Sequence, residues 1–333
     1  IRRYVHLGTG NYNDSTAKLY TDMGLLTCSE AIGEDATAVF NMLSGYSEPA
    51  VWNKLSLAPL WLRDRFLFMI RRETEHAKNG EPAHIMAKMN SLCDQELIAA
   101  LYEASAAGVK IELVVRGICC LKVGIPGISE NIEVRSLVGN FLEHSRIYYF
   151  LNGGQEEVYL SSADWMPRNL DRRVEILFPV ENEHLKQEVI HVLEIQLRDT
   201  LKAQIKQSDG TYSKVDRRGK EALCAQDYFM EYAKKMELEC VAKGIYLSPD
   251  AWEDPFYLLQ TRYPQIIFSH ETSLYLLGMA EREPLQFTVT VKAGYHAKSM
   301  KEQKIKVYRV KRELLELGVV NLESPEGHLV KAY

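Results

Sequence analysis

Strand-like and helical segments alternate over roughly the first 200 residues, and this order constrains the fold more than any other feature of the chain. Short apolar runs such as 110–116 are separated by longer runs of helical periodicity such as 94–107, which is typical of an α/β fold. Ser29 and Asp94 are expected N-caps, and Gly108 is an expected C′ residue. The expected strands are 3–7, 20–26, 85–90, 110–116, 132–136, 146–151, 158–161 and 173–179, and the expected helices are 29–43, 59–79, 94–107 and 184–207.

Composition bounds the size of the protein and the partners it can attract. The chain has 333 residues, 46% of them hydrophobic and 26% charged, as in ordinary globular proteins, and this length allows two or three domains. Its formal net charge of −5 gives no general attraction for a polyanion. Any phosphate binding must therefore come from locally placed arginine and lysine side chains.

The cysteines and the apolar runs bear on the cellular compartment. The six cysteines form no C-x-x-C pair and no zinc-ligand spacing, and adjacent Cys119 and Cys120 cannot comfortably bridge each other. We therefore expect reduced thiols and a cytoplasmic location. The chain has no signal peptide and no apolar run of about 18 residues that would predict a membrane span. Its beginning at Ile1, within an expected strand, suggests a piece of a longer protein.

The candidate site lies in residues 141–169. His144 and Arg146 are two residues apart in an expected strand, so both side chains should project from the same face. A Gly-Gly hairpin at 153–154 leads to the next strand, which ends in the small-residue turn 161–164. A histidine, a fixed cation and a group of hydroxyl and N–H donors are what phosphoryl chemistry needs.

A second, smaller turn of this kind occurs near the start of the chain. Gly8, Thr9, Gly10 and Asn11 follow the strand-like residues 4–7. Such a turn is a weak signal by itself and is more often only a turn. Together with residues 141–169, it suggests a duplicated site for handling phosphate.

The chain resembles the C-terminal half of bacterial polyphosphate kinases in three long segments. These are residues 1–27 (IRRYVHLGTGNYNDSTAKLYTDMGLLT), 87–150 (beginning AKMNSLCDQ and ending EHSRIYYF) and 158–180 (VYLSSADWMPRNLDRRVEILFPV). The resemblance extends over about residues 1–235 and implies phospholipase-D-like domains of mixed sheet flanked by helices. On this basis residues 1–54 would be a truncated first catalytic domain, ending at a turn-rich boundary near 45–49, and residues 55–235 a second one.

The resemblance also implies a reaction and its participants. The family transfers the terminal phosphate of ATP reversibly to inorganic polyphosphate through a phosphohistidine, which lies in an H-x-K motif upstream of the turn at 8–11. The implied partners are ATP or ADP and polyphosphate, and the intact enzyme is expected to be a homo-oligomer. No carboxylate cluster marks a metal site made by the protein alone, so Mg²⁺ is expected to arrive with ATP. We expect this chain to be inactive, or nearly so, by itself.

Three residues carry the sharpest implied roles. His144 corresponds to the family's second histidine, which is linked to nucleotide binding and acid–base help; the alternative is a half-buried histidine bonded to a carbonyl. Arg116 ends an apolar strand before Gly117 and would hold nucleotide phosphates, unless it only forms a surface ion pair. Tyr20 would contact the nucleotide, and its alternative is a core position.

The remaining candidates surround these three residues. Arg173 and Glu175 share an expected strand face and could pair, which would hold the arginine rigid for phosphate. The turn at 8–11 would support the phosphohistidine. The complete set of further candidates is Arg146, Ser161, Ser162, Asp164, Arg168, Asn169, Arg173 and Glu175.

Residues 236–333 resemble a different family, the AbiEi-type antitoxins of type IV toxin–antitoxin systems. Residues 239–247 would be the wing of a winged helix, and the small segment is expected to be α+β. This leaves a competing hypothesis, a non-catalytic binding or regulatory protein with a DNA-binding tail. Nucleic acid is not an expected partner except through this tail, where the basic stretch 292–312 alternates with apolar residues.

Overall fold

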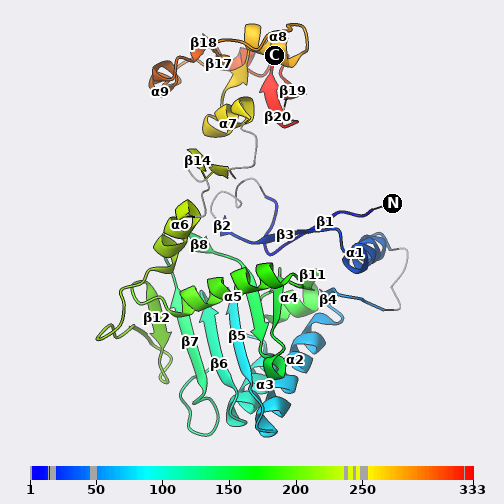
Figure 1. Ribbon diagram of the computed structural model, residues 1–333, viewed down its shortest axis with the longest axis vertical. Coiled ribbons are helices and arrows are strands. Elements are labelled where there is room, and N and C mark those ends of the chain that lie inside the picture. The colour runs from blue at the N-terminus through cyan, green and yellow to red at the C-terminus, as the bar shows by residue number, and fades with distance from the viewer. Residues whose placement is uncertain are drawn as a thin grey trace. The chain divides into compact units, whose positions relative to one another are not determined.

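The computed structural model describes residues 2–13, 15, 20–45, 51–235, 239–242, 245–247, 254–325 and 327–333 (Figure 1). The chain forms two compact units, Ile1–Tyr228 and Phe229–Tyr333. The expected boundary near 45–49 and the expected junction at Met236 lie largely outside the described residues. Within those residues, no helix combines the length and the apolar character needed to cross a bilayer.

A mixed sheet forms the centre of the first unit. Its described strands follow the spatial order β13-β12-β7-β6-β5-β9-β10-β11-β4. Strands β5, β6 and β7 are parallel, whereas β5 pairs antiparallel with β9 and the sheet continues antiparallel beyond it. The bounds are β4 Ser56–Ala58, β5 His84–Met89, β6 Lys110–Val115, β7 Ile132–Leu137, β9 Arg146–Phe150, β10 Glu157–Ser161, β11 Glu175–Pro179, β12 Ala203–Lys206 and β13 Tyr212–Lys214.

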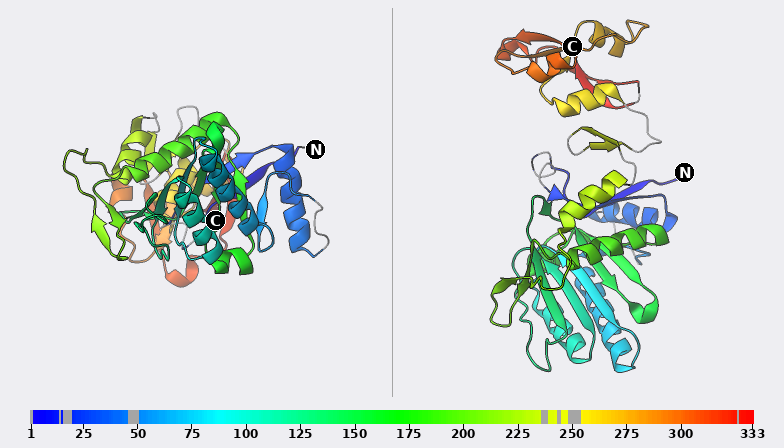
Figure 2. Two further views of the ribbon diagram at one scale, coloured as in Figure 1. Left: turned by 90° about the horizontal axis from the view of Figure 1, so that it is seen from below. Right: turned by 60° about the vertical axis from the view of Figure 1, so that its left-hand side comes forward.

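Helices cover both faces of this sheet (Figures 1 and 2). Helices α2 (Leu62–Lys78) and α3 (Gln95–Ala106) pack on the face where alternate β5 residues, Ile85, Ala87 and Met89, join one buried core. Helix α5 (Glu183–Leu197) contacts β5, β6, β9 and β10. Because strand side chains alternate, the residues between those core positions face α5. The predicted α/β class, with a mixed sheet flanked by helices, is confirmed.

The N-terminal segment adds two short strand pairs to the first unit. Strands β1 (Val5–Gly8) and β3 (Gly24–Thr27) pair antiparallel, and β2 (Tyr20–Thr21) pairs parallel with β8 (Leu142–Glu143). The pairing of β2 with β8 brings the start of the chain to the segment that carries His144. The remaining elements of this unit are α1 Glu30–Leu43, α4 Pro167–Arg172, the 3₁₀ turn Asn152–Gly154 and α6 Ala225–Lys235, which continues into the second unit.

Local sequence signals explain most of these boundaries. The Asp94 side chain accepts a hydrogen bond from the backbone N–H of Leu97 and caps α3, and Gly108 follows that helix with φ +98°, as expected. Ser29 stands at the N-cap of α1 but its side chain makes no capping bond. The hairpin expected at 153–154 joins β9 to β10.

Two sequence expectations were wrong. The single strand expected at 20–26 is two strands, β2 and β3, because the chain turns between them at Asp22, whose carboxylate is held by Thr9. The helix expected at 184–207 ends at Leu197. Asp199 ends it, because its buried carboxylate accepts hydrogen bonds from the backbone N–H groups of residues 201–203 and of Ala225. The chain then continues as β12.

The second unit is a small α+β fold, as predicted. Its described strands form a hairpin, β14 (Glu239–Ala242) with β15 (Ile245–Leu247), and a mixed sheet of order β18-β17-β16-β20-β19. Phe256, Phe268 and Val289 lie in its core. The bounds are α7 Pro255–Arg262, β16 Ile267–Phe268, α8 Glu271–Leu276, β17 Thr288–Lys292, α9 Lys298–Glu302, β18 Lys306–Val310, a 3₁₀ turn Arg312–Leu314, β19 Val320–Glu323 and β20 Leu329–Ala332.

Candidate functional site

The sheet topology brings the candidate residues to one edge. Parallel strands β5 and β6 both end there, immediately before Asn90 and Arg116, and antiparallel β9 begins there at Arg146. Strand β10 runs antiparallel to β9 and so ends at the same edge, in the turn at 161–164. Segments that are far apart in the sequence therefore converge, which is the usual way an α/β fold builds a site.

His144 and Arg146 meet as the two-residue spacing predicts. Strand β9 starts at Arg146, so His144 lies just before the strand rather than within it. The backbone N–H groups of His144 and Ser145 nevertheless both donate to the Thr21 carbonyl, which fixes the segment. The Nη1 atom of Arg146 lies 3.1 Å from Nε2 of His144.

Asp22 from the N-terminal segment is the partner of His144. The distance between its Oδ2 and Nδ1 of His144 is 2.9 Å, and Thr9 donates its hydroxyl to the same carboxylate at 2.8 Å. Burial by itself would raise the pKa of Asp22, but the hydrogen bonds from His144 and Thr9 outweigh it, so this pKa is lowered. The ring of Tyr20 lies 4.6 Å from that of His144, centroid to centroid. Tyr20 therefore stands beside the histidine rather than in the core.

Arg146 is buried, and each of its three nitrogens already has an acceptor. It donates from Nε to Asp164 at 3.1 Å, from Nη2 to the other Asp164 oxygen at 3.3 Å, and from Nη1 to the Thr9 carbonyl at 3.0 Å. A forked arginine–carboxylate pair of this kind holds both partners in one geometry. Arg146 thus ties the N-terminal turn to β9 and to the turn after β10.

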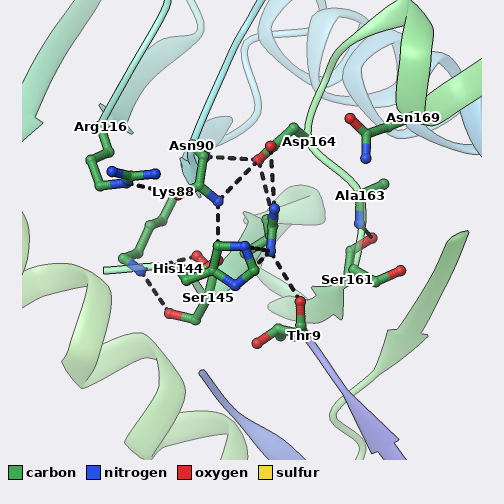
Figure 3. Close-up of polar contacts among 12 residues, drawn as sticks. Thr9, Lys88, Asn90, Arg116, His144, Ser145, Ser161, Ala163, Asp164 and Asn169 are labelled. Atoms are coloured by element: carbon green, nitrogen blue, oxygen red, sulfur yellow. Dashed lines mark hydrogen bonds and ion pairs between the residues drawn. The ribbon is translucent and has the colours of Figure 1, made fainter. Parts of the chain in front are cut away.

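Asn90 joins this group to Arg116 (Figure 3). Its backbone N–H donates to Asp164 at 2.7 Å, its side-chain amide donates to the His144 carbonyl at 3.1 Å, and its amide oxygen accepts from Nε of Arg116 at 2.9 Å. A Cβ atom on Gly117 would lie 2.9 Å from the Asn90 carbonyl oxygen, so only glycine allows this close approach. We call Thr9, Asp22, Asn90, His144, Arg146 and Asp164 the buried network. Thr9, Asn90, Arg146 and Asp164 are buried, His144 is half-buried, and Asp22 lies at the exposed edge of the network.

Lys88 supports the network through Ser145, and the sequence analysis did not predict this role. Its side chain is 2% exposed, and Nζ donates to the carbonyl and hydroxyl of Ser145 at 3.0 and 2.6 Å. Glu143 lies 3.4 Å from Nζ and is also held by Gln196 and Gln226. Burial lowers the pKa of Lys88. A lysine inside the apolar strand 84–89 was the available signal, because lysine is rarely buried without a partner.

The turn after β10 uses its own donors internally. The Ser161 hydroxyl donates to the Ile176 carbonyl, and the Ser162 hydroxyl donates to Glu175. Asn169 also donates to Glu175, at 2.7 Å. The two serines therefore join β10 to β11, and their hydroxyls do not form the open group of donors that the sequence suggested.

Three arginines border this edge with exposed or half-buried guanidinium groups. Arg173 lies 3.8 Å from Glu175 and is 48% exposed, so the expected pair forms but is loose. Arg168 is exposed, and no described residue bonds to it. Arg116 is half-buried, and Asn90 holds its Nε. We call Arg116, Arg168 and Arg173 the arginine rim.

The N-terminal turn lines a hollow in the surface. Its walls include Gly8, Gly10, Asn11, Tyr20 and Asp22. A Cβ atom on Gly10 would overlap the Asp22 carboxylate, so the turn packs directly on the partner of His144. Backbone N–H groups of a glycine-rich turn can receive an anion. Nowhere among the described residues do three or more His, Cys, Asp or Glu side chains gather closely enough to hold a metal ion.

This edge of an α/β sheet gathers a histidine and several arginine side chains, and comparison with known proteins defines the family. Residues 55–226 match the family model for polyphosphate kinase C-terminal domain 2, and residues 1–49 match that for C-terminal domain 1. The chain belongs to the polyphosphate kinase family.

Individual relatives agree with this assignment. The chain is 59% identical over 218 residues to the polyphosphate kinase of Halalkalibacterium halodurans, which covers 65% of this chain and 31% of that protein. It is 58% identical over 212 residues to that of Synechocystis sp., covering 64% and 29%. The crystal structure of polyphosphate kinase from Porphyromonas gingivalis matches with a TM-score of 0.68 and 42% identity, covering 71% of this chain and 36% of that one. The chain thus spans about a third of the length of these relatives.

Proposed function

We propose that residues 1–228 form part of the site at which a polyphosphate kinase transfers phosphate reversibly between ATP and inorganic polyphosphate. In the intact enzyme the phosphate would pass through a histidine upstream of the turn at 8–11. The observation that supports this proposal most is the buried network, which joins the segment matched to C-terminal domain 1 (Thr9, Asp22) to the segment matched to domain 2 (Asn90, His144, Arg146).

His144 is the group we propose for proton exchange with the reacting phosphate. Its Nδ1 is engaged by Asp22, which fixes the orientation of the ring. A histidine held by a carboxylate in this way can exchange a proton with a phosphate oxygen. Tyr20, which packs on the ring, would contact the nucleotide.

The arginine rim is the group we propose for the phosphate oxygens. Arg116 is held at Nε by Asn90, which leaves its two terminal nitrogens to form a fork toward an anion. Arg173 and Arg168 would add positive charge beside it. Arg146 would contribute its charge from within the buried network, where its donors already have partners. Mg²⁺ would enter with the nucleotide and neutralise phosphate charge, because its preferred partners include the phosphates themselves.

Calorimetric titration of the whole chain with ATP and Mg²⁺ tests the role of His144. We expect His144→Ala to weaken binding roughly tenfold to a hundredfold, the range for losing a hydrogen bond to a charged group. His184→Ala is the matched control, because His184 is exposed at the start of α5. Equal affinity of wild type and His144→Ala would contradict the proposal.

For residues 236–333 the antitoxin-like hypothesis rests on one observation. The described residues of the expected wing, 239–247, form an antiparallel hairpin of β14 and β15. We propose that this hairpin contacts DNA, as a wing would. Binding of the full chain to a duplex that contains its own promoter, measured by fluorescence anisotropy, tests this. Affinity no greater than for a scrambled duplex would contradict it.

A further inference from the structure

Two cysteines lie side by side on segments that leave the sheet next to each other. Leu92 follows β5 and pairs with Cys119, which follows β6, in a parallel bridge. The Leu92 N–H donates to the Ile118 carbonyl and the Cys120 N–H donates to the Leu92 carbonyl, both at 2.8 Å. Cys93 and Cys120 are the next pair along this bridge, and successive side chains alternate in direction. They therefore face each other on the side opposite Leu92 and Cys119.

The surroundings of these thiols agree with that geometry. Burial, and to a smaller extent the nearby Cys120 side chain, raises the pKa of the Cys93 thiol to about 12. Cys120 is exposed, whereas Cys93 is half-buried. Adjacent strands lie roughly 4.8 Å apart, within the range of about 4.4–6.8 Å that separates the Cα atoms of a disulfide.

Cys119 is not part of this pair. It packs against the hydrophobic core of the first unit, and its Sγ lies 3.9 Å from the Leu121 carbonyl oxygen. Metal chelation is not favoured either, since no third cysteine, histidine or carboxylate among the described residues completes a metal-binding group here. Two facing thiols, one exposed and one sheltered, remain.

We propose that Cys93 and Cys120 form a reversible disulfide by exchange with a small disulfide such as oxidised glutathione. Exposed Cys120 attacks first as a thiolate. One sulfur of the small disulfide bonds to Cys120, and the other leaves as a thiol after taking up a proton. Cys93 then loses its proton and attacks the mixed disulfide, which releases the second thiol. In sum, two protein thiols are oxidised and one small disulfide is reduced to two thiols.

The disulfide would link the two segments that carry Asn90 and Arg116, whose hydrogen bond joins the buried network to the arginine rim. Cys93 lies three residues after Asn90, and Cys120 lies four residues after Arg116. Oxidation would thus brace the Asn90–Arg116 hydrogen bond from the adjoining turns. This inference concerns a modification site and does not depend on the proposed kinase activity.

Peptide mapping of the folded, full-length chain tests the proposal. The reduced protein is incubated with oxidised glutathione at mildly alkaline pH, remaining thiols are alkylated, and the protein is digested with trypsin. Cleavage after Lys88, Lys110, Arg116 and Lys122 places Cys93 in peptide 89–110 and Cys120 in peptide 117–122. Peptide 117–122 also contains Cys119, which is alkylated. We expect the two peptides to appear joined, with the mass of two hydrogen atoms lost and one alkyl group added, and to separate after reduction with dithiothreitol.

Three variants identify the sulfur atoms. Cys93→Ser should abolish the joined peptide and leave a glutathione adduct on Cys120. Cys120→Ser should abolish it and leave Cys93 largely without an adduct, whereas Cys119→Ser should retain the joined peptide. Cys28→Ser is the control for general handling, because Cys28 lies in the N-terminal segment. The proposal would be overturned if the link survived in Cys120→Ser, or if the folded wild type gave only separate adducts. A link that formed only in denaturant would overturn it as well.

Discussion

The buried network and the arginine rim both contain arginine, but in opposite environments. The Arg146 side chain is 8% exposed and spends its donors on Asp164 and on the Thr9 carbonyl, whereas that of Arg173 is 48% exposed and has one loose ion pair. An arginine whose nitrogens have acceptors within the protein stabilises the fold, whereas one whose donors face solvent can bind an anion. The difference implies that substitutions in the network should cost stability, and substitutions in the rim should cost anion binding.

Removal of Asp164 should give the largest effect on stability. Asp164→Ala leaves the Arg146 guanidinium buried without its carboxylate and deprives Asn90 of an acceptor. Breaking a buried ion pair typically costs about 3–5 kcal/mol. Urea unfolding followed by tryptophan fluorescence would report this, since Trp165 is fully buried in the same unit. A loss below about 1 kcal/mol would show that the network is not a structural unit.

Lys88→Met should have the next largest effect. The variant fills the space but removes the donors to the Ser145 carbonyl and hydroxyl, which costs about 1–3 kcal/mol of unfolding free energy near neutral pH. Because burial lowers the pKa of Lys88, the unfolded chain binds more protons than the folded one at alkaline pH. The stability of wild type relative to Lys88→Met should therefore rise as pH increases toward the ordinary lysine value. A difference that stays constant or falls between neutral pH and about pH 10 would contradict this account.

Asp22→Asn should lower the unfolding free energy by a smaller amount, and this loss should depend on pH. The pKa of Asp22 is lowered in the folded state, so its contribution is present above its ordinary value of 3.8 and is lost as pH falls through the folded-state value. We expect wild type to exceed Asp22→Asn by about 1 kcal/mol near neutral pH and by less in acid, measured by urea unfolding. Asp64→Asn, at an exposed site on α2, is the control. An advantage unchanged by acid would mean that the Asp22–His144 pair does not contribute in this way.

The arginine rim should give the smallest effect on stability. Arg168→Ala and Arg173→Ala remove exposed guanidinium groups, and such surface changes usually alter unfolding free energy by less than about 0.5 kcal/mol. If the comparison is right, both variants unfold as wild type does while their affinity for polyphosphate falls. Destabilisation as large as that of Asp164→Ala would erase the distinction between rim and network.

The sequence predicted the fold class and the strand that carries the site because both depend on local patterns. The period-two spacing of His144 and Arg146 and the cap at Asp94 are signals within a few residues. The split of 20–26 into two strands was not predictable in this way, because it depends on Thr9 and His144 holding Asp22. The end of α5 depends similarly on Asp199 reaching Ala225.

The sequence predicted which residues lie at the site better than it predicted how they are bonded to one another. Arg116, His144, Arg146 and Asp164 do converge. The sequence did not indicate that each nitrogen of Arg146 has an acceptor, or that Ser161 and Ser162 bond to β11. Asn90 and Lys88 were missed because their partners lie 54 or more residues away, at His144 and Ser145. Long-range partners of this kind are set by the order of strands in the sheet, and this order cannot be predicted from a single sequence.

Calorimetric titration of the full chain with polyphosphate of defined length, comparing wild type with Arg116→Ala, tests the central claim most directly. Arg198→Ala is the matched control, because Arg198 lies after α5 with its side chain 63% exposed and only a long 3.7 Å ion pair. The account predicts that Arg116→Ala lowers affinity at least roughly tenfold with unchanged unfolding, and that Arg198→Ala leaves affinity near that of wild type. Equal losses in the two variants, or none in Arg116→Ala, would contradict the assignment of the rim as the anion-binding surface.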